Sequence, residues 1–156
     1  MYRLDIRLAT FKDIEPMCRL YNAFFAYNAG LRPEYCKASQ ESGDYPQSVI
    51  ASENADIFVA VEGDAPVGFI HIRKAQTPPF DSVVPRHYAE IIDFFVSDSH
   101  REKGLGSKLM EAAKQWSIAR NLDYIELSVL SNAKEALCFY EHKDFVTVLH
   151  TMRCVL

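Results

Sequence analysis

The stretch that decides the fold of this chain is Arg101-Glu102-Lys103-Gly104-Leu105-Gly106-Ser107. It follows the apolar run Ile91-Ile92-Asp93-Phe94-Phe95-Val96, which is typical of a strand. After it, apolar residues recur at helical spacing, at Leu105, Leu109, Ala112, Ala113, Trp116 and Ala119. A glycine loop between a strand and a helix binds phosphate, because the first amides of a helix lack intrahelical partners and the helix dipole attracts anions. The stretch therefore predicts a diphosphate site.

The spacing of the glycines excludes the two commoner phosphate loops. A Walker loop needs a Gly-Lys-Ser/Thr triplet, which is absent here. A dinucleotide fingerprint needs a third glycine or alanine where Leu109 stands. The remaining pattern, Arg-x-x-Gly-x-Gly, is compatible with a diphosphate cradle or with an ordinary strand-to-helix turn. The flanking sequence has to decide between these two interpretations.

Length and composition predict one globular domain spanning residues 1–156. The formal net charge of −4 argues against a nucleic-acid partner, since such proteins are usually basic. The four cysteines lack C-x-x-C spacing and no signal peptide precedes them, so a reduced, cytoplasmic protein is expected. No apolar run is long enough to cross a bilayer, so no membrane partner is expected. The five histidines show no ligand spacing, so no metal site is expected.

The hydrophobic pattern predicts strands and helices in a definite order. Strands are expected at 3–8, 57–62, 67–73, 88–96, 124–130, 145–148 and 150–155. Helices are expected at 11–27, 46–53, 105–120 and 133–142, and irregular segments at 28–46 and 74–87. Thr10 and Asp13 resemble an N-cap and an acidic first turn. The strands at 88–96 and 124–130 should be parallel neighbours, because a helical crossover joins them.

This order, together with three local motifs, resembles the GNAT acetyltransferase superfamily over essentially the whole chain. The first motif is the Arg101–Ser107 loop after Phe94-Phe95-Val96. The second, Asn132-Ala133-Lys134-Glu135-Ala136-Leu137-Cys138-Phe139-Tyr140, is similar to the family's Asn-x-x-x-Ala-x-x-Phe-Tyr element. The third is the opening Ile6-Arg7-Leu8-Ala9-Thr10 followed by Asp13. The resemblance implies an α/β (α+β) GNAT fold, with a mixed central sheet of six to seven strands and about four helices.

One stretch is similar to a particular branch of the family, the diamine (spermidine/spermine) acetyltransferases. Asp93-Phe94-Phe95-Val96 leading into the glycine loop carries this similarity. Ile92 departs from it, because that branch has a glutamate there. Asp144 departs from most members, which have glycine before the phenylalanine that is Phe145 here. The first departure weakens the case for a polyamine acceptor, whereas the second concerns a turn.

The resemblance implies direct transfer of an acetyl group from acetyl-CoA to a primary amine. The 101–107 loop would hold the pyrophosphate, and the exposed backbone of Phe94–Val96 would hold the pantetheine arm. A bulge in that strand would explain an unpaired edge inside a sheet. The Val96 amide is the expected donor to the thioester oxygen. Asn132, Ala133 and Phe139 are the remaining expected cofactor contacts.

Tyr140 is the expected general acid, because a neutral phenol can protonate a leaving thiolate. The alternative is that Tyr140 only packs beside Phe139. The resemblance makes Glu90 the first candidate for the general base, since it lies eleven residues before Arg101, the spacing of the catalytic glutamate in histone-type members of the family. Asp93 is the second candidate. In a regular strand Glu90 would share a face with Ile92 and Asp93 would point the other way, unless a bulge re-aims it. A water chain in place of either carboxylate stays open.

The expected function is acetyl-CoA-dependent N-acetylation of a small-molecule amine, in an enzyme that could be a homodimer. Two other functions stay open. One is acetylation of a protein N-terminus or lysine, and the other is a non-catalytic acyl-CoA-binding sensor. The aromatic residues of the first helix, Tyr21, Phe24, Phe25 and Tyr27, are expected to pack on its inner face. They could alternatively contact an acceptor ammonium by cation–π attraction.

Overall fold

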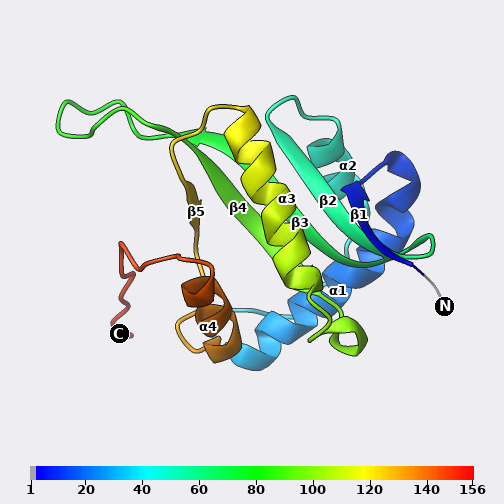
Figure 1. The fold of residues 1–156 in the computed structure, drawn as a ribbon. Helices are drawn as coiled ribbons and strands as arrows, with labels where there is room; N and C mark the ends of the chain where they lie inside the picture. Colours follow the sequence, from blue (N-terminus) through cyan, green and yellow to red (C-terminus); the bar gives the residue numbers. More distant parts are fainter. Residues whose placement is uncertain (1–2) are drawn as a thin grey trace.

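A computed structural model describes residues 3–156 and shows one mixed sheet covered by helices on both faces (Figure 1). The strands are β1 (Leu4–Leu8), β2 (Ala55–Glu62), β3 (Ala65–Gln76), β4 (His87–Val96) and β5 (Ile125–Leu127). Their spatial order is β1-β2-β3-β4-β5. The first four strands run antiparallel to their neighbours, and β5 runs parallel to β4 as expected for the crossover.

The helices divide between the two faces of the sheet. They are α1 (Ile14–Leu31), α2 (Asp44–Ile50), α3 (Leu105–Ala119) and α4 (Lys134–His142), with short 3-10 turns at Phe11–Asp13 and Asp98–His100. Buried α3 residues join one core cluster with Ile70, Ile72 and Ile91 of the sheet. Buried α1 and α2 residues join a second cluster with Phe69 and Phe95. Alternate residues of β3 and β4 therefore face α3 on one side and α1 with α2 on the other.

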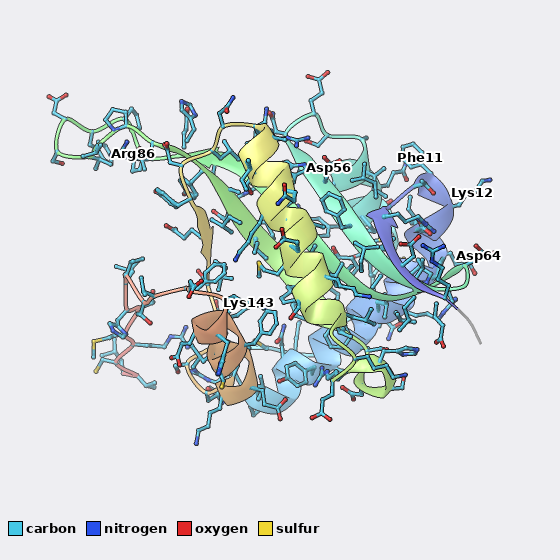
Figure 2. All side chains as sticks on the ribbon, in the orientation of Figure 1. Phe11, Lys12, Asp56, Asp64, Arg86 and Lys143 are labelled. Carbon is cyan, nitrogen blue, oxygen red and sulfur yellow. The ribbon has the colours of Figure 1, made fainter. Side chains whose placement is uncertain are left out.

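The core contains the residues that helical periodicity placed there. Trp116 of α3 is buried, and its indole Nε1 donates to Asp56 Oδ2 at 2.7 Å. Figure 2 shows Asp56 where β2 begins, beside the C-terminal end of α3. Tyr21 is fully buried and packs on Phe69 with ring centroids 4.4 Å apart. The prediction that the α1 aromatics pack against the sheet is confirmed for Tyr21 and Phe24.

The prediction of six to seven strands is wrong, because within residues 3–156 the sheet has five. The expected strands at 145–148 and 150–155 do not form, and residues 143–156 have no helix or strand. Most of the large apolar side chains of this segment are exposed to solvent, namely Val146, Val148, Leu149, Met152, Val155 and Leu156. Periodicity indicated a β-prone segment here, but a strand also has to pair with a neighbour, and residues 143–156 pair with no strand of the described sheet.

Other boundaries differ by a few residues. The first helix extends to Leu31, beyond the expected end at 27, and the strand expected at 124–130 is reduced to Ile125–Leu127. Residues 77–86 form an arm that projects from the end of β3 and β4 (Figure 1). Figure 2 places Arg86 on this arm. The Thr77 amide donates a hydrogen bond to the Arg86 carbonyl at 3.0 Å, and the Arg86 amide donates to Thr77 Oγ1 at 2.9 Å, so the base of the arm is closed by its own hydrogen bonds.

The turn before α1 is organised by Asp13, as the sequence predicted. The Asp13 carboxylate is buried and accepts from the Thr10 amide at 2.8 Å and from Arg7 at 2.7 and 3.0 Å. Burial raises the pKa of this carboxyl, but the hydrogen bonds from Arg7 and Thr10 outweigh it and lower the pKa from its ordinary value of 3.8. Asp13 therefore stabilises the fold in its ionised form.

Replacing Asp13 with asparagine is expected to lower the free energy of unfolding by about 2 kcal/mol at neutral pH, since hydrogen bonds to a buried charge are lost. The lowered pKa means that this contribution is full above pH 3.8 and disappears as the pH falls through the native-state pKa. Urea denaturation of both proteins from pH 7 downward measures the difference. If the difference in free energy of unfolding between the two proteins grew as the pH fell, the role assigned to Asp13 would be contradicted.

Candidate active site

The glycine loop has the geometry of an anion site at the start of α3. Gly104 caps the helix with φ +77°, a left-handed conformation that favours glycine. The first intrahelical hydrogen bond runs from the Lys108 amide to the Gly104 carbonyl at 3.1 Å. The amides of Leu105, Gly106 and Ser107 come before it and have no intrahelical acceptor. A Cβ built on Gly104 would meet nothing within 4 Å, so the loop is open on this side.

Gly106 plays a different part from Gly104. A Cβ at Gly106 would lie 3.5 Å from Cζ of Phe94 and 3.5 Å from Cε2 of Phe139. The glycine thus faces the aromatic side chains of β4 and α4. It brings the start of α3 beside these two elements, although they are far apart in the sequence.

Beside the glycine loop, β4 has an open edge. β5 pairs with β4 only from Ala89 to Ile91, so residues 94–96 have no strand neighbour on that side. The Ser97 amide donates to the Val67 carbonyl of β3 at 2.9 Å. Successive residues of a strand send their polar groups to opposite sides, so the Val96 amide points to the open edge. The Val96 carbonyl on that edge accepts from Arg101 Nε at 3.0 Å.

Tyr140 of α4 lies against this open edge. Its ring centroid is 6.3 Å from that of Phe94, 5.6 Å from Phe139 and 5.6 Å from Phe145. Burial raises the pKa of Tyr140 to about 12, so its phenol stays protonated at neutral pH. Packing against phenylalanines is thus observed, and a role as acid is compatible with it.

A bulge in β4 changes which side chains share a face. His71 pairs with Asp93 and Ile72 pairs with Ile91, so Ile92 is the extra residue. Asp93 consequently lies on the α1 and α2 face of the sheet, the same face as Glu90, which pairs with Arg73. The bulge therefore re-aims Asp93, whereas an unbroken strand would have turned it toward α3.

The two carboxylates on this face have different neighbours. Glu90 Oε1 is paired with the Arg73 guanidinium at 3.0 Å, and both side chains are partly exposed. Asp93 is 16% exposed, and its Oδ2 lies 3.4 Å from the Tyr45 hydroxyl and 3.6 Å from His71 Nδ1. Glu90 is thus held by a guanidinium, while Asp93 faces two groups that can exchange a proton with it.

Tyr45 and His71 were missed by the sequence analysis. Tyr45 lies in a segment expected to be irregular, and His71 lies on a β3 face that cannot be assigned before the pairing is known. The one available signal was a single histidine in the apolar stretch Val67–Ile72, since a buried histidine needs a polar partner.

Two expected cofactor contacts are engaged within the protein. Asn132 donates from Nδ2 to the Leu31 carbonyl at 2.7 Å, so it ties the start of α4 to the end of α1. The Arg101 guanidinium lies 4.9 Å from the Tyr27 ring and forms an ion pair with Asp98 at 3.1 Å. Arg101 therefore anchors the loop to α1 and β4, and Lys103 is the exposed cation of the loop.

Neither a metal-binding cluster nor a membrane-spanning helix is found among the described residues, 3–156. They contain no group of three histidine, cysteine, aspartate or glutamate side chains that could hold a metal ion. None of the helices in the same range is both long and apolar enough to span a bilayer.

Comparison with known proteins shows to which family this geometry belongs. The family model for the acetyltransferase (GNAT) family matches residues 7–145. An uncharacterised N-acetyltransferase of Archaeoglobus fulgidus is 28% identical over 142 residues, which cover 90% of this chain and 92% of the relative. One of Methanocaldococcus jannaschii is 28% identical over 140 residues, which cover 90% of this chain and 59% of that relative.

Solved structures agree in fold. A mutant of the BH1408 protein from Bacillus halodurans has a TM-score of 0.92 at 25% identity, with 97% of this chain and 99% of that chain covered. An aminoglycoside acetyltransferase from an uncultured soil metagenomic sample, in complex with sisomicin, has a TM-score of 0.73 at 19% identity, with 98% and 97% covered. The chain belongs to the acetyltransferase (GNAT) family. It is accordingly an acetyl-CoA-dependent acyltransferase.

Proposed function

We propose that this protein transfers the acetyl group of acetyl-CoA directly to a primary amine of a small molecule in the cytoplasm. The observation that carries the proposal is the meeting of three elements at the unpaired edge of β4 at residues 94–96, which we call the gap because β5 does not extend along it. The glycine loop, the open edge of β4 and Tyr140 of α4 all adjoin the aromatic pair Phe94 and Phe139. Acetyl-CoA supplies the acetyl group and a thiolate leaving group when bound, and this chain supplies the groups that hold it and move protons.

The residues at the gap fit acetyl-CoA. The first-turn amides of α3 and the exposed Lys103 suit a diphosphate, and Gly104 leaves the approach open. The amide of Val96 on the open edge can donate to the thioester oxygen, where negative charge develops during transfer. Tyr140 holds a proton at its phenol oxygen, which suits a general acid.

The two faces of the sheet separate the reactants. Tyr140 and the glycine loop lie with Phe94 on the α3 side, and Asp93 lies on the α1 and α2 side. An amine that approached from the α1 and α2 side would meet Asp93 first and reach the acetyl group through the gap. We therefore assign amine deprotonation to Asp93 in preference to Glu90, which Arg73 already neutralises.

Free-thiol release from acetyl-CoA tests the function, using polyamines, single amino acids, aminoglycosides and lysine-containing peptides as acceptors. We expect turnover with a small primary amine. The Asp93–Val96 stretch is similar to diamine acetyltransferases, which puts polyamines first in the panel. Turnover with peptides alone would favour a protein acetyltransferase. Tight CoA binding without turnover on any acceptor would favour a sensor and contradict the proposal.

We further propose that the enzyme is a homodimer in which a second copy covers residues 143–156. This segment exposes aliphatic side chains, with Val148 77% and Leu149 80% exposed, beside a sheet whose last strand has one free edge. Val148→Asp is expected to give the mass of a monomer by light scattering. Thr147→Asp, one residue away, should keep the mass of a dimer or weaken the dimer less than Val148→Asp does. A monomeric wild-type protein would contradict this assembly.

A further inference from the structure

A buried polar cluster lies on the α1 and α2 side of the bulge in β4. Tyr45 Oη is 3.0 Å from His71 Nδ1 and 3.4 Å from Asp93 Oδ2, and the histidine and aspartate atoms are 3.6 Å apart. His71 is only 4% exposed. Within the described residues, the hydroxyl of the neighbouring Tyr21 is buried without a hydrogen-bond partner. Four polar groups from α1, α2, β3 and β4 thus converge on one point.

Packing alone does not account for this composition. A buried polar group that lacks a partner costs stability, so such clusters are normally satisfied or filled with apolar residues. Here Asp93 keeps 16% of its side chain exposed, and Tyr45 is 38% exposed. The cluster is therefore open to solvent on the Tyr45 side and closed at His71. A cation entering beside Tyr45 would reach the Asp93 carboxylate and could donate a hydrogen bond to the Tyr21 oxygen.

We propose that Asp93, Tyr45 and His71 form a proton relay that removes the proton of the acceptor ammonium. In the structure the Tyr45 hydroxyl donates to Asp93 Oδ2 and lies within hydrogen-bond distance of His71 Nδ1. In the proposed relay Nδ1 is an acceptor, and the hydroxyl turns to donate to it once Asp93 is protonated. The N–H bond of the ammonium breaks and an O–H bond forms on Asp93. The Asp93 proton passes to Tyr45 Oη as the Tyr45 proton passes to Nδ1, which leaves an aspartate, a neutral tyrosine and an imidazolium. After the product leaves, the proton returns to solvent by the same path.

The surroundings of the cluster favour a concerted transfer through Tyr45. Burial and the charge of Asp93 raise the pKa of Tyr45 well above its ordinary value, so its phenol cannot lose a proton without gaining another. The other titratable or charged groups that face the cluster are Tyr21 on α1, Glu41 before α2, Arg73 on β3 and Glu90 on β4. Of these, Arg73 and Glu90 pair with one another.

The test compares two acceptors of similar size, ethylamine and trifluoroethylamine, in the intact enzyme. Ethylamine is an ammonium ion at neutral pH and needs a base, whereas trifluoroethylamine is already a neutral amine. For Asp93→Asn we expect kcat/KM with ethylamine to fall about 100-fold, since positioned proton transfer contributes that much, and with trifluoroethylamine to change less than about threefold. For His71→Gln and Tyr45→Phe we expect kcat/KM with ethylamine to fall about tenfold, and kcat/KM with trifluoroethylamine to change less than about threefold.

Glu90→Gln is the matched control, because it removes a carboxylate from the same face outside the cluster. It should keep the acidic limb of the wild-type pH–rate profile with ethylamine, and His71→Gln should displace that limb. This inference rests on the proposed function. Absence of wild-type turnover with these two amines and with every acceptor of the panel above would overturn both. Equal losses with the two amines, or loss of the acidic limb in Glu90→Gln, would overturn the relay alone.

Discussion

Replacing Tyr140 with phenylalanine is expected to lower kcat about 100-fold or more, because a positioned general acid contributes about 10²–10⁴ in rate. Only the hydroxyl is removed, and the packing of the ring against Phe94, Phe139 and Phe145 is kept. The raised pKa of about 12 keeps the phenol protonated below that pH, so loss of the acid should affect the whole working range equally. Steady-state kinetics with acetyl-CoA and a saturating amine measure the effect.

The affinity for CoA separates this role from a structural one. The dissociation constant of the Tyr140→Phe enzyme, measured by calorimetry, should stay within about twofold of wild type, because the hydroxyl is assigned to the transition state and not to binding. Phe139→Leu serves as the packing control, since it disturbs the same aromatic group without removing an acid. A Tyr140→Phe enzyme with kcat near that of wild type would show that the tyrosine only packs.

Placing a negative charge at Gly104 is expected to weaken CoA binding about 30- to 150-fold. Unit charges 4 Å apart repel by about 4 kcal/mol at an effective dielectric of 20 and by about 1 kcal/mol in bulk water, so the exposed loop should give about 2–3 kcal/mol. Gly104→Asp is suitable because a Cβ there meets nothing within 4 Å. Calorimetric titration with CoA measures the loss.

Gly104→Asn provides the matched control for this experiment. Aspartate and asparagine have nearly the same shape and both tolerate the positive φ of 77° better than other side chains do. The difference between the two variants therefore isolates the charge, and it should shrink in high salt, which screens exposed charges. Acetyl-pantetheine, which lacks the diphosphate, should bind both variants equally. If the Gly104→Asp and Gly104→Asn variants bound CoA with the same affinity, the diphosphate would not be bound at this loop.

The sequence predicted the parts of the fold that depend on local periodicity and loop chemistry. The strand, glycine loop and helix from Ile91 to Ala119 formed as expected, and β5 runs parallel to β4. The Asp13 turn is also confirmed. Asp144 adopts φ +67°, a left-handed conformation that favours glycine, so its place in a turn is confirmed. Each of these features is determined within a short segment of the chain.

Features that depend on pairing between distant segments could not be predicted in this way. The Asp93 side chain changes face because of one extra residue in the register with β3. The relay cluster needs α2 to be placed over β3, and no local pattern reports that contact. The C-terminal segment has a strand-like sequence, but it pairs with no strand of the described sheet, and a local pattern does not report pairing. The ion pair of Glu90 with Arg73, because of which we propose Asp93 in preference to Glu90 as the base, likewise becomes visible only in three dimensions.

The extra residue in β4 affects two properties of the strand, namely which face each side chain occupies and how far β5 pairs with it. Deletion of Ile92 alone would leave Ile91, Asp93 and Phe94 on their present faces of the sheet. These three residues already alternate as in a regular strand, because Ile92 has no partner in the register with β3. The pairing of β5 with β4 ends at Ile91, directly before this extra residue. Because a bulge bends its strand and disrupts pairing, we expect removal of Ile92 to straighten β4 and to let β5 pair with it beyond Leu127. The open edge at residues 94–96 would then depend on the presence of the extra residue and not on its side chain.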